Sequence, residues 1–284
     1  MRRHDSHSPA NVKAAAAVLL VLITVAAPAG AVALCPAAGD VSATVASVHD
    51  GATFALADGT VVALAGIDPP RRPLGLAADA PWPIGDVARQ GLATALAKGA
   101  VTLAWSGAAM DRYGRRRAYV FAGGESVAMA LLRQGLAQVR WREGEADCFG
   151  AFVAVEDPAI EAGLGLWSLP EFRPMAANDP SLAAENGLYR LVEGRVESIG
   201  DGSRMTFLDF GRNFRRDFTV MVPQAVAAEM AGAGQPADTL AGRFVRVRGV
   251  IEENGGPAVR LNDAAELEVI DDGHHGAVLP PATR

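Results

Sequence analysis

The feature that most constrains the fold is a run of short strand patterns separated by Asp-Gly turns near the start of the chain. Alternating apolar residues cover 41–48, 53–56 and 60–67, and Asp-Gly pairs stand between them at 50–51 and 58–59. Asp-Gly suits tight hairpin turns because glycine adopts positive φ without steric cost. The pattern predicts an antiparallel β-meander.

Helical spacing appears after this meander. Apolar residues recur at intervals of three and four over 84–98, 126–133 and 149–162. Two further strand patterns, 101–105 and 117–121, stand between the first two of these segments. The first half of the chain is therefore predicted to be a strand-rich domain with three helices.

A second series of strand patterns follows a polar, proline-containing segment at 171–186, which we interpret as a linker. Five or so strands with one short helix at 224–230 predict a small OB-like β-barrel over 187–271. The predicted fold class is β-rich α+β, with a first domain over 34–170 and a flexible tail over 272–284.

The first 33 residues are predicted to be a secretory signal peptide. Basic residues at 2, 3 and 13 precede an apolar run over 14–27, and Ala31-Val32-Ala33 offers a small-x-small cleavage site. An uncleaved N-terminal anchor is the alternative, whereas Leu34 before Cys35 disfavours a lipoprotein. We expect a periplasmic or secreted protein with no membrane span in its mature form.

The net charge argues against a protein held to nucleic acid by bulk electrostatics. Lysine and arginine number 26 against 32 aspartates and glutamates, a formal net charge of −6. Removal of residues 1–33 takes away three basic residues and one acidic residue, which leaves −8. Binding that is dominated by phosphate neutralisation needs a basic surface instead.

The chain has two cysteines, Cys35 and Cys148, and both lie after the predicted cleavage site. Export to an oxidising compartment makes a disulfide between them the simplest expectation. Two cysteines without a nearby pair of histidines do not indicate a zinc site.

Five segments between residues 41 and 168 stand in a recognisable order and spacing. They are Val48-His49-Asp50-Gly51-Ala52-Thr53, Ala63-Leu64-Ala65-Gly66-Ile67-Asp68-Pro69-Pro70-Arg71, Asp111-Arg112-Tyr113-Gly114-Arg115, the helix over 127–139, and Glu156 followed eleven residues later by Trp167. Together they resemble the staphylococcal nuclease (thermonuclease) family, and their order and spacing carry the resemblance because each motif alone is weak. The resemblance implies a five-stranded OB-like barrel with three helices, export, and calcium-dependent phosphodiester cleavage.

The resemblance places five catalytic positions on this chain, and only Asp68 and Arg115 keep the family's residue type. Asp68 corresponds to a metal-binding carboxylate and Arg115 to a phosphate-binding arginine. Ala52 replaces the other metal-binding carboxylate, Ala63 replaces the other arginine, and Arg71 replaces the general-base glutamate. A methyl group cannot ligate calcium, which prefers carboxylate and carbonyl oxygens. The general base, one metal-binding carboxylate and one phosphate-binding arginine are thus all absent.

We therefore expect a catalytically degenerate nuclease homologue that acts as a binding or interaction module of the cell envelope. Its partner would be single-stranded nucleic acid or another envelope protein, and no cofactor is expected. The alternative is a calcium-dependent endonuclease that cleaves single-stranded DNA or RNA at a relocated site. That site would recruit Asp50 to the cation, Arg71 or Arg72 to the phosphate, and Asp79 as base. In the plainest interpretation Asp50 and Asp68 only hold turns.

The resemblance also implies aromatic contacts with a ligand. Trp141 stands where the family has a base-stacking aromatic residue, and Tyr113 where it has a phosphate-contacting tyrosine. With Arg115 they could hold a single strand by stacking and phosphate contact. The alternative is that Trp141 covers the barrel and that its flanking arginines pair with nearby acids, namely Arg140 and Arg142 with Glu143 and Glu145.

Two further predictions concern charged residues. Arg133 and Glu156 match structural positions of the family and are expected to form a helix-to-helix ion pair. In the second half, alternation with valines predicts an arginine-bearing outer face. That face is either a ligand surface or a solvated one neutralised by Glu266 and Glu268. Its members are Arg246, Arg248 and Arg260, together with Phe210, Arg212, Phe214, Arg215 and Arg216.

Overall fold

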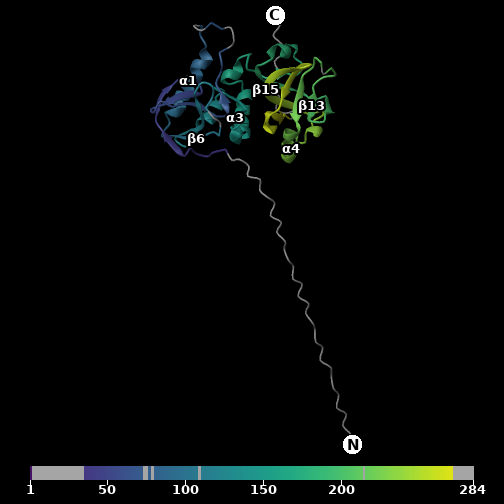
Figure 1. Ribbon diagram of the computed structural model, residues 1–284, viewed down its shortest axis with the longest axis horizontal. Helices are drawn as coiled ribbons and strands as arrows, with labels where there is room; N and C mark the ends of the chain where they lie inside the picture. The colour runs from purple at the N-terminus through teal and green to yellow at the C-terminus, as the bar shows by residue number, and fades with distance from the viewer. Residues whose placement is uncertain (2–34, 73–75, 78–79, 108–109, 214, 271–284) are drawn as a thin grey trace. The chain divides into compact units, whose positions relative to one another are not determined.

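The computed structural model describes Met1 and residues 35–72, 76–77, 80–107, 110–213 and 215–270. The described residues from Cys35 onward belong to one compact unit (Figure 1). The predicted signal peptide beyond Met1 and the predicted tail lie outside the described residues. Within the described residues, no helix is long and apolar enough to cross a membrane.

The first half of the compact unit is built on a seven-stranded sheet. Its strands follow the order β1-β6-β7-β4-β3-β2, and β8 pairs with β7. The β4–β7 pair is parallel and the others are antiparallel. The strands are β1 (Val41–Ala43), β2 (Val45–Val48), β3 (Thr53–Leu56), β4 (Val61–Leu64), β6 (Val101–Trp105), β7 (Arg116–Ala122) and β8 (Glu125–Ser126).

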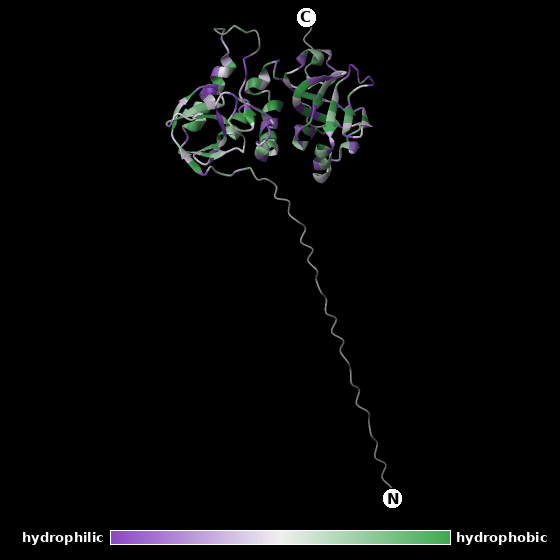
Figure 2. Ribbon diagram, in the orientation of Figure 1, coloured by the Kyte–Doolittle hydropathy of each residue, from purple (hydrophilic) through white to green (hydrophobic). Residues whose placement is uncertain are grey.

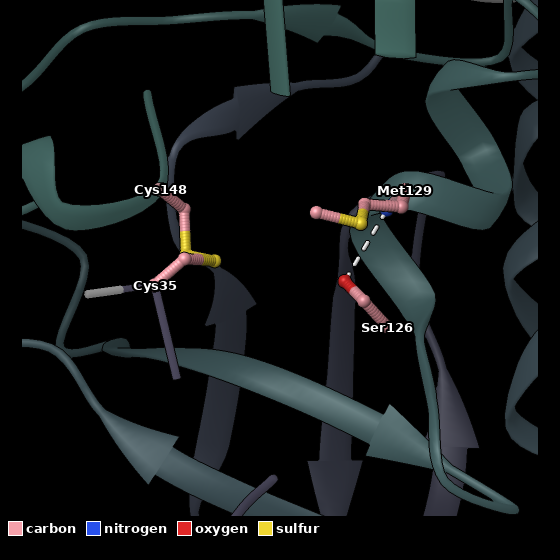
Figure 3. Close-up of a disulfide and its surroundings, with 4 residues drawn as sticks. All are labelled: Cys35, Ser126, Met129 and Cys148. Atoms are coloured by element: carbon pink, nitrogen blue, oxygen red, sulfur yellow. Dashed lines mark hydrogen bonds between the residues drawn. A yellow bond between two sulfur atoms is a disulfide. The ribbon is translucent and has the colours of Figure 1, made fainter. Parts of the chain in front are cut away.

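Three helices accompany this sheet, close to the predicted ranges: α1 (Pro83–Leu96), α2 (Val127–Leu132) and α3 (Phe149–Glu161). Helix α2 packs against both other helices. It begins at Ser126, whose hydroxyl accepts a hydrogen bond from the backbone N–H of Met129 at 3.4 Å (Figure 3). This contact is an N-cap, which satisfies a donor that the first turn leaves free. A two-stranded sheet of β5 (Ile67–Asp68) and β9 (Gln138–Val139) completes this half.

The second half is built on an eight-stranded sheet. Its order is β10-β11-β15-β16-β14-β13-β12, and β17 pairs with β15. Parallel pairs join β14 to β16 and β10 to β11. The elements are β10 (Met175–Ala176), β11 (Tyr189–Arg195), β12 (Ser198–Asp201), β13 (Met205–Asp209), β14 (Thr219–Pro223), α4 (Gln224–Gly232), β15 (Phe244–Asn254), β16 (Gly256–Arg260) and β17 (Leu267–Val269).

The two sheets repeat one strand order. In each, an antiparallel meander leads to a parallel pair, β4 with β7 or β14 with β16. A helix, α1 or α4, follows the third strand of the meander in both halves. The ends of the shared path are consecutive strands, β1 and β2 in the first half and β11 and β12 in the second. This β-rich α+β architecture is consistent with an OB-like fold.

Each half has its own hydrophobic core, and Figure 2 shows hydrophobic residues in both halves of the compact unit. A third, smaller cluster joins the halves. It packs Ile160 of α3, Trp167 and Leu191 of β11 together, with Tyr189 and Phe172 partly buried against them. The segment interpreted as a linker takes part in the fold, since it contains β10 and the 3-10 helix Pro180–Glu185 with buried Leu182.

The predicted disulfide between Cys35 and Cys148 is confirmed (Figure 3). Its Cα atoms are 4.4 Å apart, and 113 residues separate the two cysteines in the sequence. Cys148 ends the 3-10 helix Ala146–Cys148, immediately before α3, and is buried. The bond ties the segment that leads into β1 to the start of α3.

Candidate functional site

Two of the five catalytic positions lie in the hydrophobic core. Ala52 and Ala63 are 4% and 3% exposed. Ala63 lies on β4 opposite Thr53 of β3, and the carbonyl of Ala52 accepts a hydrogen bond from the N–H of Leu64 at 2.9 Å. Their methyl groups can neither ligate a cation nor contact a phosphate. Neither position therefore supplies polar chemistry.

Asp68, the position that the resemblance assigns to a metal-binding carboxylate, forms ion pairs with two arginines. Gly66, with a φ of +74°, forms the turn between β4 and β5, and Asp68 is the last residue of β5. The Asp68 carboxylate is 8% exposed and lies 3.0 Å from the Arg71 guanidinium, through Oδ2. Its other oxygen, Oδ1, accepts a hydrogen bond from Arg142. Both carboxylate oxygens therefore already bind a cation, and Arg71 occupies a place beside Asp68 instead of acting as a base.

Arg115 is positioned by its own loop. The Asp111 carboxylate accepts hydrogen bonds from the backbone N–H groups of Tyr113 and Arg115, at 2.9 and 3.0 Å. It also forms an ion pair with the Arg115 guanidinium at 2.7 Å. A third contact joins Arg115 to the Thr53 hydroxyl at 3.4 Å. The Tyr113 ring is 67% exposed, with the guanidinium groups of Arg112 and Arg115 4.9 and 5.0 Å from its centre.

The residues present do not fit the calcium ion that the family resemblance implies. Asp68 is ion-paired, and Asp50 accepts a hydrogen bond from the N–H of Ala52 at 2.8 Å, which closes a turn. Among the described residues, no group of three or more Asp, Glu, His or Cys side chains could hold a metal. Arg72 donates to the carbonyls of Ala77 and Ala80, both at 2.7 Å. Asp79 lies outside the described residues.

A cleft of about 950 Å³ opens beside Asp68, and residues of both halves line it. Its charged lining is predominantly basic. Among the described residues that line it, six are arginines and four are acids: Arg71, Arg72, Arg112, Arg140, Arg142 and Arg190, against Asp68, Glu143, Glu171 and Glu266. The predicted aromatic residue Trp141 lines the cleft together with Tyr189 and Phe172. The formal charge of the cleft lining is thus positive, whereas the net charge of the chain is negative.

The arginines that flank Trp141 pair as predicted only in part: Arg142 forms an ion pair with Glu145, but its nearer partner is Asp68. Arg142 binds Asp68 and lies 3.9 Å from Glu145, while the Arg140 guanidinium stacks 4.1 Å from the centre of the Tyr189 ring. Trp141 packs partly buried against the first core, as the alternative interpretation expected. Sequence reasoning missed Tyr189 because it belongs to β11 of the second half, far away in the sequence.

A buried ion pair beneath the cleft was also missed. Glu145 is 1% exposed and pairs with Arg117 of β7. The same carboxylate accepts a hydrogen bond from the backbone N–H of Gly66 at 2.7 Å. Arg117 in turn donates to the carbonyl of Leu64 at 2.7 Å. These contacts fix the turn at Gly66 and hence the position of Asp68, although nothing in the local pattern around Glu145 indicates such a role.

The predicted ion pair between Arg133 and Glu156 is wrong. Arg133 is exposed at the end of α2, whereas the Glu156 side chain is fully buried on α3 and pairs with Arg248 of β15. Glu156 also accepts a hydrogen bond from the N–H of Val139 at 2.6 Å. Burial raises the pKa of Glu156, and the Arg248 guanidinium works against that rise. The partner of Glu156 therefore comes from the other half of the chain (Figure 1 shows β15 beside α3).

The predicted outer face of the second half is wrong for two of its arginines. Arg246 and Arg248 are 3% and 0% exposed because α3 covers them. Their acidic partners are Glu156 and Asp157 of α3, Glu193 of β11 and Glu268 of β17. Glu268 was predicted as a partner, whereas Glu266 binds Asn262 instead. Arg260 is exposed, as expected.

Other predicted residues of that face line a second cavity of about 910 Å³ in the second half. Phe210 lies there with Arg212, Arg215 and Arg216. Five acids share the lining within the described residues, namely Asp179, Glu197, Asp217, Glu252 and Glu253. Phe214 lies outside the described residues. Carboxylates outnumber the arginines here, so this cavity does not favour an anion.

Comparison with known protein families gives one match, to the family described as staphylococcal nuclease homologue, over residues 61–169. This segment is staphylococcal nuclease-like. It includes Asp68, Arg115, Trp141 and the first-half wall of the cleft, so the nuclease-like segment carries the candidate site. A search of the curated proteins gave no match.

Proposed function

We propose that the chain is a catalytically degenerate nuclease homologue that binds an anionic ligand in the cleft beside Asp68 without cleaving it. One observation carries the proposal: Arg71 and Arg142 occupy both oxygens of the only family-type metal carboxylate. Ala52 and Ala63 are buried and supply no replacement. Binding, in contrast, needs only basic and aromatic groups, and the cleft presents both.

The discriminating assay incubates the purified protein with single-stranded DNA and RNA, in calcium or in a chelator. We expect no calcium-dependent cleavage. Cleavage that requires calcium and disappears in Asp68→Ala would establish the alternative, a calcium-dependent endonuclease. The triple variant Ala52→Asp, Ala63→Arg, Arg71→Glu gives a second test. If this variant cleaves and the wild type does not, the chain has kept the nuclease scaffold and lost the catalytic groups.

Binding is tested separately by titrating labelled single strands at several salt concentrations. We expect weak association that falls as salt rises, because few arginines contact phosphate. Arg112→Gln, at the mouth of the cleft, should weaken it. The matched control Arg89→Gln alters an exposed arginine on α1, away from the cleft, and should not. If no association is found at low salt, single-stranded nucleic acid is excluded as the ligand. An anionic group on a protein partner then remains as the candidate.

We also infer that the protein is exported and that each sheet closes into an OB-like barrel. The charged, apolar and small-residue segments of residues 1–33 support export, and so does a disulfide, which persists in oxidising compartments. In each sheet, the shared strand order begins and ends with two strands that are consecutive in the sequence, β1 and β2 or β11 and β12. This arrangement supports closure of the sheets into barrels. Cell fractionation, with N-terminal sequencing of the mature protein, tests the export. A protein that stays in the cytoplasm with its first 33 residues intact would contradict it.

A further inference from the structure

We propose that the cleft holds a binding site for a dianionic phosphate group, centred on Arg140 and completed by Tyr189 of β11. The inference rests on the proposed function, because it names the chemical class of ligand that the cleft takes. The group is either inorganic phosphate or the terminal phosphate of a larger ligand. The second half of the chain is then part of the site, since it supplies Tyr189.

Arg140 is a half-buried cation that forms no ion pair with a carboxylate of the described residues. Its guanidinium stacks 4.1 Å from the centre of the Tyr189 ring, and no carboxylate lies within 4 Å of it among the described residues. Burial lowers the pKa of Arg140, Asp68 opposes that change, and Arg142 and Arg71 add to it. A cation that loses water without gaining a counter-ion costs free energy. A bound anion would remove that cost.

The charge around Arg140 matches a doubly charged group. Arg71 and Arg142 share the carboxylate of Asp68, and Arg142 also pairs with Glu145, which Arg117 neutralises. With Arg140 the cluster therefore carries a formal charge of +2. Burial raises the pKa of Glu266 to about 7, so this acid of the lining only partly opposes the charge at neutral pH. A phosphate monoester carries about −1.5 to −2 at pH 7, whereas a carboxylate or a phosphodiester carries about −1. The match favours a terminal or free phosphate.

Aromatic residues line the cleft beside its arginines, namely Trp141, Phe172 and Tyr189. The Tyr189 ring lies against the Arg140 guanidinium, 4.1 Å from the ring centre. The N–H groups of a guanidinium lie in its plane, so contact with a ring leaves them able to bind an oxyanion.

The test titrates the full protein with inorganic phosphate, phenyl phosphate and acetate at pH 7.5 and constant ionic strength, by calorimetry. We expect saturable binding of one phosphate and at least tenfold weaker binding of acetate. Tighter binding of phenyl phosphate would mean that the group belongs to a larger aromatic ligand, whereas equal binding would favour free phosphate. Arg140→Gln should weaken phosphate binding at least tenfold, and the control Arg89→Gln should leave it unchanged.

Three results would overturn the inference: no saturable phosphate binding up to 10 mM (about the weakest affinity that a built site would have), equal affinity for acetate, or unchanged affinity in Arg140→Gln. If the Gln variant does not fold, Arg140→Lys keeps the charge but loses the planar fork, and should bind several-fold more weakly. The proposed function fails independently, on calcium-dependent cleavage. Phosphate binding at Arg140 by an active nuclease would leave the inference standing and the proposed function refuted.

Discussion

Replacing Arg248 tests the most consequential difference between the sequence pattern and the structure. By alternation along its strand, Arg248 belongs on a solvated face with Arg260. In the structure its side chain is fully buried, pairs with Glu156 and Glu268, and lies 3.7 Å from Asp157. Arg248→Met keeps most of the volume and removes the charge. It leaves Glu156 buried without its cation. Of the two buried arginines in this cluster, Arg246 alone then faces four acids, namely Glu156, Asp157, Glu193 and Glu268.

The expected cost follows from that geometry. Removing one partner of a buried pair typically costs about 3–5 kcal/mol, because the other charge is left uncompensated. A protein of this size loses roughly 2–4 °C of melting temperature per kcal/mol, so we expect a fall of roughly 6–20 °C. The assay is calorimetric unfolding at pH 7 with the disulfide intact. Arg260→Met, on an exposed arginine of β16, is the matched control and should change stability by less than about 0.5 kcal/mol.

The double variant Glu156→Gln, Arg248→Met identifies the pair directly. Gln keeps an oxygen for the N–H of Val139, so the comparison isolates the charge. We expect the double variant to be more stable than the sum of the single effects predicts, with a coupling of at least 1 kcal/mol. Wild-type stability in Arg248→Met, or equal losses in Arg248→Met and Arg260→Met, would refute the placement of α3 against β15.

Three further predictions follow from the same contacts. Burial, with Glu268 beside it, raises the pKa of Asp157 to about 7, above its value of about 4 in the unfolded chain. The stability that protonated Asp157 contributes is therefore fully present below about pH 4, and it is lost as the pH rises through 7. Melting temperatures between pH 5 and 8 should fall, less so in Asp157→Asn, and a flat profile in the wild type would contradict this. Reducing the Cys35–Cys148 bond should cost about 2–5 kcal/mol in urea unfolding, because the bond closes a long loop, whereas unchanged stability would mean that the unfolded chain is already compact. Adding Arg142→Gln to the triple restoring variant should raise any calcium-dependent cleavage, since Arg142 otherwise still holds Asp68, and lower cleavage would show that Arg142 assists.

Sequence patterns predicted the elements of this fold well where the information is local. The Asp-Gly turns, the spacing of apolar residues and the glycines after helices each depend on a few neighbouring residues. Predicted helices such as 149–162 therefore agree with α3 to within a residue or two. The disulfide was predictable for a different reason: two cysteines in a chain that is expected to be exported leave one pairing.

Sequence patterns failed where a residue's surroundings come from a distant segment. Period two on β15 correctly separates two faces of the strand, but it cannot tell which face meets solvent and which meets another helix. Arg246 and Arg248 were assigned to solvent because arginine is usually exposed. Glu156, buried on the facing side of α3, has the complementary charge, yet 92 residues separate it from Arg248. Nothing local connects the two.

Under the proposed function, loss of the metal site and gain of a basic cleft would be one physical change. The family's glutamate at position 71 would add a negative charge beside Asp68, where a divalent cation needs it. An arginine there reverses the sign and binds Asp68 itself. The carboxylate that would have attracted calcium is then neutralised, and Arg142 and Arg140 are left in excess of their acids. We propose that a site which in the family holds a cation against phosphate attracts phosphate directly in this chain. Tyr189 of β11 lines that site, and it lies outside the nuclease-like segment 61–169.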